Sequence, residues 1–179
     1  LPIAISCQPF SEKEMKRLAQ MGVDRIGIPL DGATENVFDK VKGSLANSPY
    51  MWEEHLKALK RAIKIFGKSK VSTHLIVGLG ETEEEMMDMI QWCVDNGVYP
   101  ALFSFTPIPG TVLEGASQPS LDCYRRIQVA HYLITNKKTR CENITFDSDG
   151  RLIDFGVLKD ALLQAVRCGK PFLTSGCPD

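Results

Sequence analysis

The segment from Val71 to Glu81 places the strongest constraint on the fold. It reads Val-Ser-Thr-His-Leu-Ile-Val-Gly-Leu-Gly-Glu, and its apolar, β-branched first part predicts a buried strand. Gly78 and Gly80 then predict a tight turn, and Thr82 with the glutamates after it predicts the start of a helix. A strand that leads through a glycine turn into a helix is typical of the sheet edge where α/β enzymes bind their ligands.

The glycine turn at Gly78 and Gly80 has two interpretations, one as a ligand site and one as a purely structural turn. A dinucleotide fingerprint needs a third glycine, but Glu83 stands at that position, and carboxylates in a first helical turn would repel a phosphate. The turn better suits a ligand with an ammonium group or hydroxyls, with Glu81 as a hydrogen-bond acceptor. The alternative is structural: the glycines only form the turn, Thr82 and Glu85 form a capping box, and Glu83 and Glu84 favour the helix dipole.

Composition narrows the class of protein. A chain of 179 residues is long enough for one core, and its net charge of −1 argues against nucleic acid as a partner. No apolar run approaches the roughly 18 residues of a membrane helix, and the amino end does not resemble a signal peptide. The six cysteines are scattered, so a disulfide framework is not expected and a reducing cytoplasm is the expected location. The chain starts at Leu1 on an apparent core strand and stops soon after Cys177, so a fragment at both ends is expected.

One strand-helix unit recurs along the chain. Alternating strands and helices imply parallel strands with right-handed crossovers, and their spacing favours a barrel or partial barrel over a three-layer sheet. Polar or turn-forming residues follow the strands, namely Gln8, Asp31, Glu81 and Thr106, and in a barrel they would converge on one mouth. We expect strands at 2–8, 23–30, 71–77, 101–105, 143–146 and near 172, and helices at 11–21, 35–41, 51–66, 82–96, 121–135 and 157–167.

These segments, in this order, resemble the radical S-adenosylmethionine (SAM) superfamily, and within it the biotin synthase and lipoyl synthase branch. The resemblance rests on residues 11–31, on Gly78-Leu-Gly-Glu-Thr and on residues 106–110. It implies an α/β fold, a parallel partial (β/α)6 TIM-like barrel that lacks its first strands. A single domain over residues 1–179 is expected, with the best match over 1–113 and the carboxyl-terminal barrel portion over 114–179. In this family a reduced [4Fe-4S] cluster cleaves SAM, and the 5′-deoxyadenosyl radical abstracts hydrogen from an unactivated carbon.

The resemblance also implies cofactor-binding roles for individual residues, while no residue is assigned to catalysis. Asp31 corresponds to the ribose-binding carboxylate, which can accept hydrogen bonds from both ribose hydroxyls. Ile76 and Gly78 correspond to the strand against the adenine face, Glu81 ends the same motif, and Thr106 lies where strand backbone contacts the adenine edge. The structural alternatives are a loop cap for Asp31, a core residue for Ile76 and a turn residue for Thr106.

The chain also departs from the family pattern. The cluster motif Cys-x3-Cys-x2-Cys and the motif that holds the methionine amino group are absent, so the primary [4Fe-4S] ligands are expected outside this chain. Ala4 and Ser72 stand where biotin synthase carries auxiliary-cluster cysteines, which disfavours biotin formation. Residues 174–177 are placed like the closing segment of lipoyl synthases, so Cys177 is a candidate ligand of an auxiliary iron-sulfur cluster, the alternative being an ordinary cysteine. The resemblance is nearer to the two-protein archaeal type of lipoyl synthase, or to an uncharacterised relative, than to the single-chain bacterial enzyme.

Three functions follow. The first is sulfur insertion in lipoyl-type or biotin-type cofactor biosynthesis, by a sulfurtransferase-like enzyme whose complete chain carries the cluster motif. The second is another radical SAM reaction, such as a rearrangement or methylthiolation, and the third is a non-catalytic barrel segment. The expected partners are a small-molecule or lipoyl-type substrate, an electron donor and a partner protein, with no nucleic acid and no membrane.

The histidines and the remaining cysteines have simpler interpretations. His74 lies within a strand and is expected in the core or the barrel lining, whereas His55 and His131 lie on helices and are expected to face solvent. Cys7 ends a strand near the predicted mouth and stays open as a substrate or cluster contact. Cys93 reads as a small hydrophobe on a helix.

Overall fold

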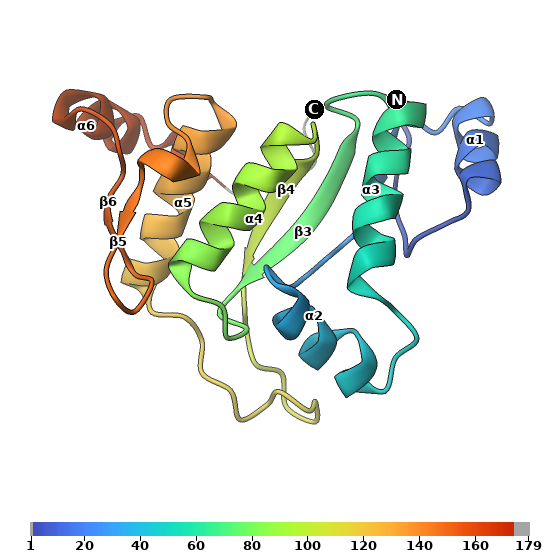
Figure 1. Cartoon of the computed structure of the whole chain (residues 1–179), viewed down its shortest axis with the longest axis horizontal. Helices are drawn as coiled ribbons and strands as arrows, with labels where there is room; N and C mark the ends of the chain where they lie inside the picture. Colours follow the sequence, from blue (N-terminus) through green and yellow to red (C-terminus); the bar gives the residue numbers. More distant parts are fainter. Residues whose placement is uncertain (1, 174–179) are drawn as a thin grey trace. The chain divides into compact units, whose positions relative to one another are not determined.

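Strands and helices alternate along the computed structural model, which describes residues 2–173 (Figure 1). The elements agree closely with the segments expected from the sequence as far as residue 135. The strands are β1 (Ala4–Ser6), β2 (Arg25–Gly27), β3 (Val71–Val77), β4 (Tyr99–Ser104), β5 (Thr145–Phe146) and β6 (Leu152–Asp154). The α-helices are α1 (Glu12–Gln20), α2 (Glu35–Val41), α3 (Trp52–Phe66), α4 (Glu83–Asp95), α5 (Leu121–Thr135) and α6 (Lys159–Arg167). Short 3₁₀ helices are η1 (Ser44–Ala46), η2 (Cys141–Asn143) and η3 (Lys170–Phe172).

A four-stranded sheet has the order β1-β2-β3-β4. β1 pairs in parallel with β2, with Ser6 opposite Gly27, and β2 pairs in parallel with β3, with Ile26 opposite Val71. Helices connect these strands, which is how parallel neighbours must be joined. The expected α/β fold with parallel strands is therefore confirmed, while its continuation into a barrel stays a prediction.

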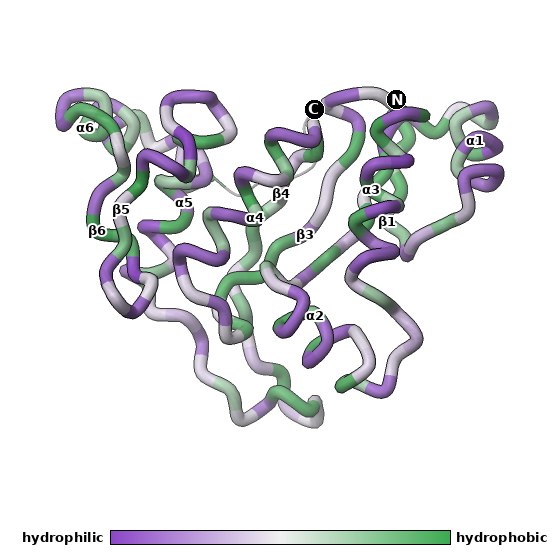
Figure 2. Tube along the Cα trace, viewed as in Figure 1, coloured by the Kyte–Doolittle hydropathy of each residue, from purple (hydrophilic) through white to green (hydrophobic). Residues whose placement is uncertain are grey.

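The residues of β3 alternate in burial, as a strand requires. Val71, Leu75 and Val77 are each at most 1% exposed, whereas His74 and Ile76 on the other face are half-buried. Figure 2 shows apolar residues along β3 and an alternation of apolar and polar residues along α3. The strand is thus fully buried on one face and only half-buried on the other.

Helix α1 begins and ends as the sequence predicts. Ser11 and Glu14 form the expected capping box, in which the Ser11 hydroxyl accepts from the Glu14 N–H and the Glu14 carboxylate accepts from the Ser11 N–H. Gly22 follows the helix at φ +93°, a conformation that glycine adopts without strain. These local signals fix the connection between β1 and β2.

The described residues divide into two units. The first contains residues 2–75 and 92–101, and the second contains 76–91 and 102–173. Met15, Phe38 and Leu59 are completely buried in the core of the first unit. Met86 and Leu133 are completely buried in the second unit, where α5 also packs against α6 and η3.

The last part of the chain differs from the expected strand-helix repeat. β5 pairs with β6 in an antiparallel hairpin, because the Asp147 carboxylate accepts from the Asp149 and Arg151 N–H groups and closes a tight turn at Gly150. The prediction of a strand near Phe172 is wrong, because Gly169 at φ +71° leads into the 3₁₀ helix η3. Among the described residues, no helix is both long enough and apolar enough to cross a membrane.

Candidate functional site

Asp31 follows β2 in a conformation that few residue types adopt. Its φ is +66°, in the left-handed region where Asp and Asn are enriched among non-glycine residues. The Asp31 N–H donates to the His74 carbonyl at 2.9 Å, and Asp31 forms an isolated parallel bridge with Leu75. The backbone thus holds this carboxylate where β2 ends, as the sequence predicts. Such a conformation often marks a functional site.

Lys42 binds one oxygen of the Asp31 carboxylate. Its Nζ lies 2.7 Å from Asp31 Oδ2 and also donates to the Pro29 carbonyl at 2.6 Å. The two side chains are only 10% and 25% exposed, so the ion pair is partly shielded from water. No described residue donates a hydrogen bond to Asp31 Oδ1, which leaves this oxygen available to ligand hydroxyls. Lys42 is not among the site residues predicted from the sequence, because no motif marks a lysine that follows a short helix.

The charges of Asp31 and Lys42 affect the pKa values of two histidines. Burial lowers the pKa of both His55 and His74, the Asp31 charge raises them, and the Lys42 charge lowers them. His74 is half-buried on β3, which agrees with its expected place in the core or lining.

The expectation that His55 faces solvent is wrong. Its ring is completely buried because it packs edge-on against Phe38, with ring centroids 4.9 Å apart, and against Tyr50 at 5.8 Å. Its nitrogens lie 3.0 Å from the Met51 carbonyl and 3.1 Å from Gln8 Oε1. His131 on α5 is likewise buried, at 9% exposed, because α5 lies in the core of the second unit rather than on its surface.

In the second unit, Glu81 closes the glycine turn. Its carboxylate accepts from the Gly78 N–H at 2.7 Å and from the Leu79 N–H at 3.0 Å. Burial raises the pKa of Glu81, while these backbone hydrogen bonds lower it. The carboxylate therefore has a structural task. Each of its oxygens still has a second lone pair, and a role in cofactor binding stays a prediction.

The turn lies beside the residues that follow β4. A Cβ on Gly78, which has φ +101°, would lie 2.7 Å from Pro119 Cδ. The Phe105 N–H donates to the Val77 carbonyl at 2.9 Å, and Thr106 Oγ1 accepts from Gln118 at 3.3 Å. The second unit thus brings the predicted residues Gly78, Glu81 and Thr106 onto one connected turn and loop.

The other two predicted cofactor residues lie elsewhere in the two units. Ile76 belongs to the second unit and is half-buried on β3. Asp31 belongs to the first unit. The roles of both toward adenine and ribose stay predictions.

The backbone N–H groups at the start of α4 donate hydrogen bonds to other groups of the protein. Thr82 and Glu85 form the expected capping box at 2.8 and 3.1 Å, and the Glu84 N–H donates to the Gly150 carbonyl at 3.0 Å. A helix start that binds phosphate needs these donors free. The observed contacts therefore agree with the inference that this glycine turn does not bind phosphate.

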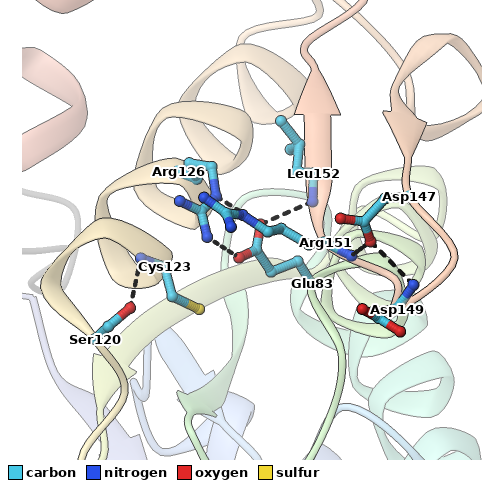
Figure 3. A network of polar contacts seen from close by, with 8 residues as sticks. All are labelled: Glu83, Ser120, Cys123, Arg126, Asp147, Asp149, Arg151 and Leu152. Carbon is cyan, nitrogen blue, oxygen red and sulfur yellow. Dashed lines mark hydrogen bonds and ion pairs between the residues drawn. The ribbon is translucent and has the colours of Figure 1, made fainter.

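Glu83 does more than favour the helix dipole. It is only 7% exposed, and its carboxylate binds the Arg126 guanidinium through two hydrogen bonds and accepts from the Leu152 N–H at 3.0 Å (Figure 3). The Cys123 thiol also lies at this carboxylate, and burial together with the Glu83 charge raises its pKa to about 11. Glu83 thus joins α4 to α5 and to the β5–β6 hairpin. A single sequence could not show this, since Arg126 lies 43 residues away.

Within residues 2–173, no three His, Cys, Asp or Glu side chains are grouped as a metal site requires. The described cysteines lie singly: Cys93 is completely buried, as expected for a small hydrophobe, and the Cys141 thiol hydrogen-bonds Asp88 at 3.1 Å. Cys7 lies just beyond β1, where burial raises its pKa. Cys177 lies outside the described residues, so its predicted role as a cluster ligand is untested.

Comparison with known proteins gives one family. The family model described as the radical SAM superfamily matches residues 1–93, just over half of the chain. A GTP 3′,8-cyclase of Rippkaea orientalis is 30% identical over 94 residues, which cover 52% of this chain and 27% of the cyclase. A bacteriochlorophyllide c C-7(1)-hydroxylase of Chlorobaculum limnaeum is 26% identical over 115 residues, covering 64% of this chain and 28% of the hydroxylase.

The longest of these alignments is to an uncharacterised protein of Methanocaldococcus jannaschii. It is 26% identical over 158 residues, which cover 85% of this chain and 39% of that protein. The chain therefore spans less than half the length of each relative named here.

Proposed function

Because the chain belongs to the radical SAM superfamily, we propose that it forms the SAM-binding part of a radical SAM enzyme. The family implies SAM and a [4Fe-4S] cluster, which together supply a 5′-deoxyadenosyl radical when bound. In this proposal the four-stranded parallel sheet is part of a partial barrel, and the nucleoside of SAM lies at the carboxyl end of β2, where Asp31 stands.

The ion pair between Asp31 and Lys42 is the observation that supports the proposal most directly. A ribose offers two adjacent hydroxyl donors, and a carboxylate with a fixed orientation and an unused oxygen suits them. Lys42 at 2.7 Å fixes Asp31 Oδ2, and Asp31 Oδ1 is free of described partners. The described residues thus fit the nucleoside part of SAM.

The described residues do not fit the iron-sulfur cluster. Its ligands in this family are three cysteines in a short motif, and the sequence has no such spacing. No group of cysteines stands in for them within the described part. In our proposal the described residues bind and orient SAM, and the cluster ligands are supplied from outside them.

A radical SAM reaction other than sulfur insertion is favoured. The characterised relatives are named a cyclase and a hydroxylase, which favours another radical SAM reaction at an unactivated carbon. The positions of the auxiliary-cluster cysteines of biotin synthase hold Ala4 on β1 and Ser72 on β3, and neither side chain replaces a thiolate ligand. Sulfur insertion on a lipoyl-type substrate remains the second candidate, and it depends on Cys177.

The proposal includes the partners that such chemistry needs. A radical SAM reaction takes one electron to begin, so a protein electron donor is required, and the substrate is a small molecule or a lipoyl-type group. A non-catalytic barrel segment is the alternative if no cluster forms.

Anaerobic expression of the native-length protein with iron and sulfide tests this function. We expect about four iron atoms for each SAM site and reductant-dependent formation of 5′-deoxyadenosine from SAM. A second cluster would favour sulfur insertion, because that reaction consumes one. A native-length protein that bound no iron and cleaved no SAM would refute the enzymatic proposal.

A further inference from the structure

Helix α3 of the first unit carries cations and no carboxylates after its first turn. Between residues 55 and 80 the chain has no Asp or Glu but six cationic residues, which are Lys57, Lys60, Arg61, Lys64, Lys68 and Lys70. The first four lie on α3 at positions i, i+3, i+4 and i+7, which share one side of a helix. We call these four residues the basic stripe. Because the net charge of the chain is −1, the stripe is a local concentration of positive charge.

The protein itself neutralises little of this charge. The Glu54 carboxylate lies 3.2 Å from Lys57 Nζ and 3.9 Å from Arg61 Nη2. Arg61 Nε is buried and has no hydrogen-bond partner within residues 2–173. Lys64 is exposed and forms no ion pair with a described carboxylate. Arg61 and Lys64 therefore keep donors that an external carboxylate can use.

The neighbouring helix α1 does not supply the missing carboxylates. α1 packs against α3, and the pKa of Glu12 on α1 is lowered chiefly by its hydrogen bond with Lys16 and further by the charges of Lys64 and Arg61. Glu12 is already paired with Lys16 at 2.6 Å. Arg17, also on α1, is exposed and adds a further positive charge on this helix.

The basic stripe destabilises its own helix. Cations three and four residues apart on a helix repel one another, and each member of the stripe has two such neighbours. The packing of the other side of α3 offsets this cost, because Ala58, Leu59 and Ala62 are completely buried there. Carboxylates placed along the stripe by another molecule would relieve the repulsion.

The surroundings of the stripe favour a protein as the source of these carboxylates. A helix that binds a membrane surface needs an open apolar face, whereas the apolar face of α3 is buried in the protein. Nucleic acid presents a continuous row of phosphates, some of which would face Glu53 and Glu54 at the start of α3. The net charge of −1 also gives no overall attraction to nucleic acid.

We propose that the basic stripe is a docking surface for an acidic protein, whose carboxylates lie on a helix at the same spacing as the stripe. Lys57 and Lys64 are seven residues apart, about 10 Å along the axis of α3. Glutamates at i, i+3, i+4 and i+7 of a partner helix extend over the same length. Each pair between exposed charges is weak and screened by salt, so the association is reversible.

Fluorescence anisotropy of labelled peptides with the native-length protein tests the proposal. The probe is a helical peptide with glutamates at i, i+3, i+4 and i+7, and the control peptide has the same composition with the glutamates in a different order. We expect the spaced peptide to bind more tightly than the control at about 0.05 M salt, and to weaken at least about tenfold at about 0.5 M. Equal binding of the two peptides, or no binding of the spaced peptide at low salt, would overturn the proposal.

Reversal of charge localises the binding. The triple variant Lys57→Glu, Lys60→Glu and Lys64→Glu should bind the acidic peptide about tenfold more weakly than the wild type. The control variant has the same lysine-to-glutamate change at three exposed lysines of the second unit, namely Lys138, Lys159 and Lys170. We expect the control variant to bind the acidic peptide like the wild type, and an equal loss in the two variants would overturn the assignment to α3.

Two further probes complete the test. A peptide with lysines in place of the spaced glutamates should bind the variant with the reversed stripe but not the wild type, a gain of binding that an unfolded variant would not show. Duplex DNA and phosphatidylglycerol vesicles should not bind through the stripe. Binding of either one to the wild type that is lost in the stripe variant, without binding of the acidic peptide, would overturn the proposal of a protein partner.

Discussion

Replacement of Gly78 by alanine tests whether the glycine turn is fixed by its contact with Pro119. Gly78 and its neighbour Gly80 both have positive φ, at +101° and +116°, so alanine costs about 1–2 kcal/mol of backbone strain at either site. A Cβ on Gly80 meets no atom within 4 Å, whereas a Cβ on Gly78 lies 2.7 Å from Pro119 Cδ. That clash adds about 1–3 kcal/mol, a typical cost of overpacking. We therefore expect Gly78→Ala to be less stable than Gly80→Ala by about 1–3 kcal/mol.

Urea denaturation followed by circular dichroism measures this difference. The two tryptophans lie in the first unit, so their fluorescence would not report the second unit directly. A double-mutant cycle isolates the contact: in a Pro119→Ala background, the cost of Gly78→Ala should fall to about that of Gly80→Ala, near 1–2 kcal/mol. Equal destabilisation by the two alanines in the wild-type background would refute the role of Pro119.

Three further predictions concern the two units separately. Glu83→Gln should destabilise the protein by about 2–3 kcal/mol in urea, because it leaves the Arg126 guanidinium without its carboxylate partner. The control variant Glu84→Gln, at an exposed position, should change stability by less than about 0.5 kcal/mol. Equal effects of the two variants would contradict the buried ion pair. Since burial lowers the pKa of His55 below its usual 6.5, the unfolded chain binds more protons below that pH, and stability should fall as pH drops from about 7 to about 5. His55→Gln should lose less stability over the same range, and an unchanged pH profile would contradict this. In native iodoacetamide labelling read by mass spectrometry, exposed Cys168 should react well before completely buried Cys93, and the reverse order would refute the assigned burial.

Local signals in the sequence predicted much of the fold. The strand at Val71–Val77, its glycine turn and the capping boxes at Ser11 and Thr82 depend on residues within a few positions of one another. The end of the chain was predicted less well. The hairpin β5–β6 depends on a side-chain turn at Asp147, and its two-residue strand carries almost no periodicity.

The candidate site was predicted as a set of positions, without its partners. Asp31 and Glu81 stand where the sequence placed them, but the sequence did not show that Lys42 binds the first or that turn amides occupy the second. The burial of His55 also escaped prediction, because its helical position alone did not reveal the aromatic rings packed around it. Contacts between distant residues are not encoded in the spacing of a single sequence.

Binding of SAM to the chain and to Asp31→Asn tests the central claim most directly. Asparagine tolerates the positive φ of residue 31, so the variant keeps the backbone while it removes the carboxylate charge and one acceptor oxygen. Calorimetry should show SAM binding to the wild-type chain, about tenfold weaker binding to Asp31→Asn, and unchanged binding to the exposed control Glu35→Gln. Equal affinity of SAM for the wild type and Asp31→Asn would contradict the account.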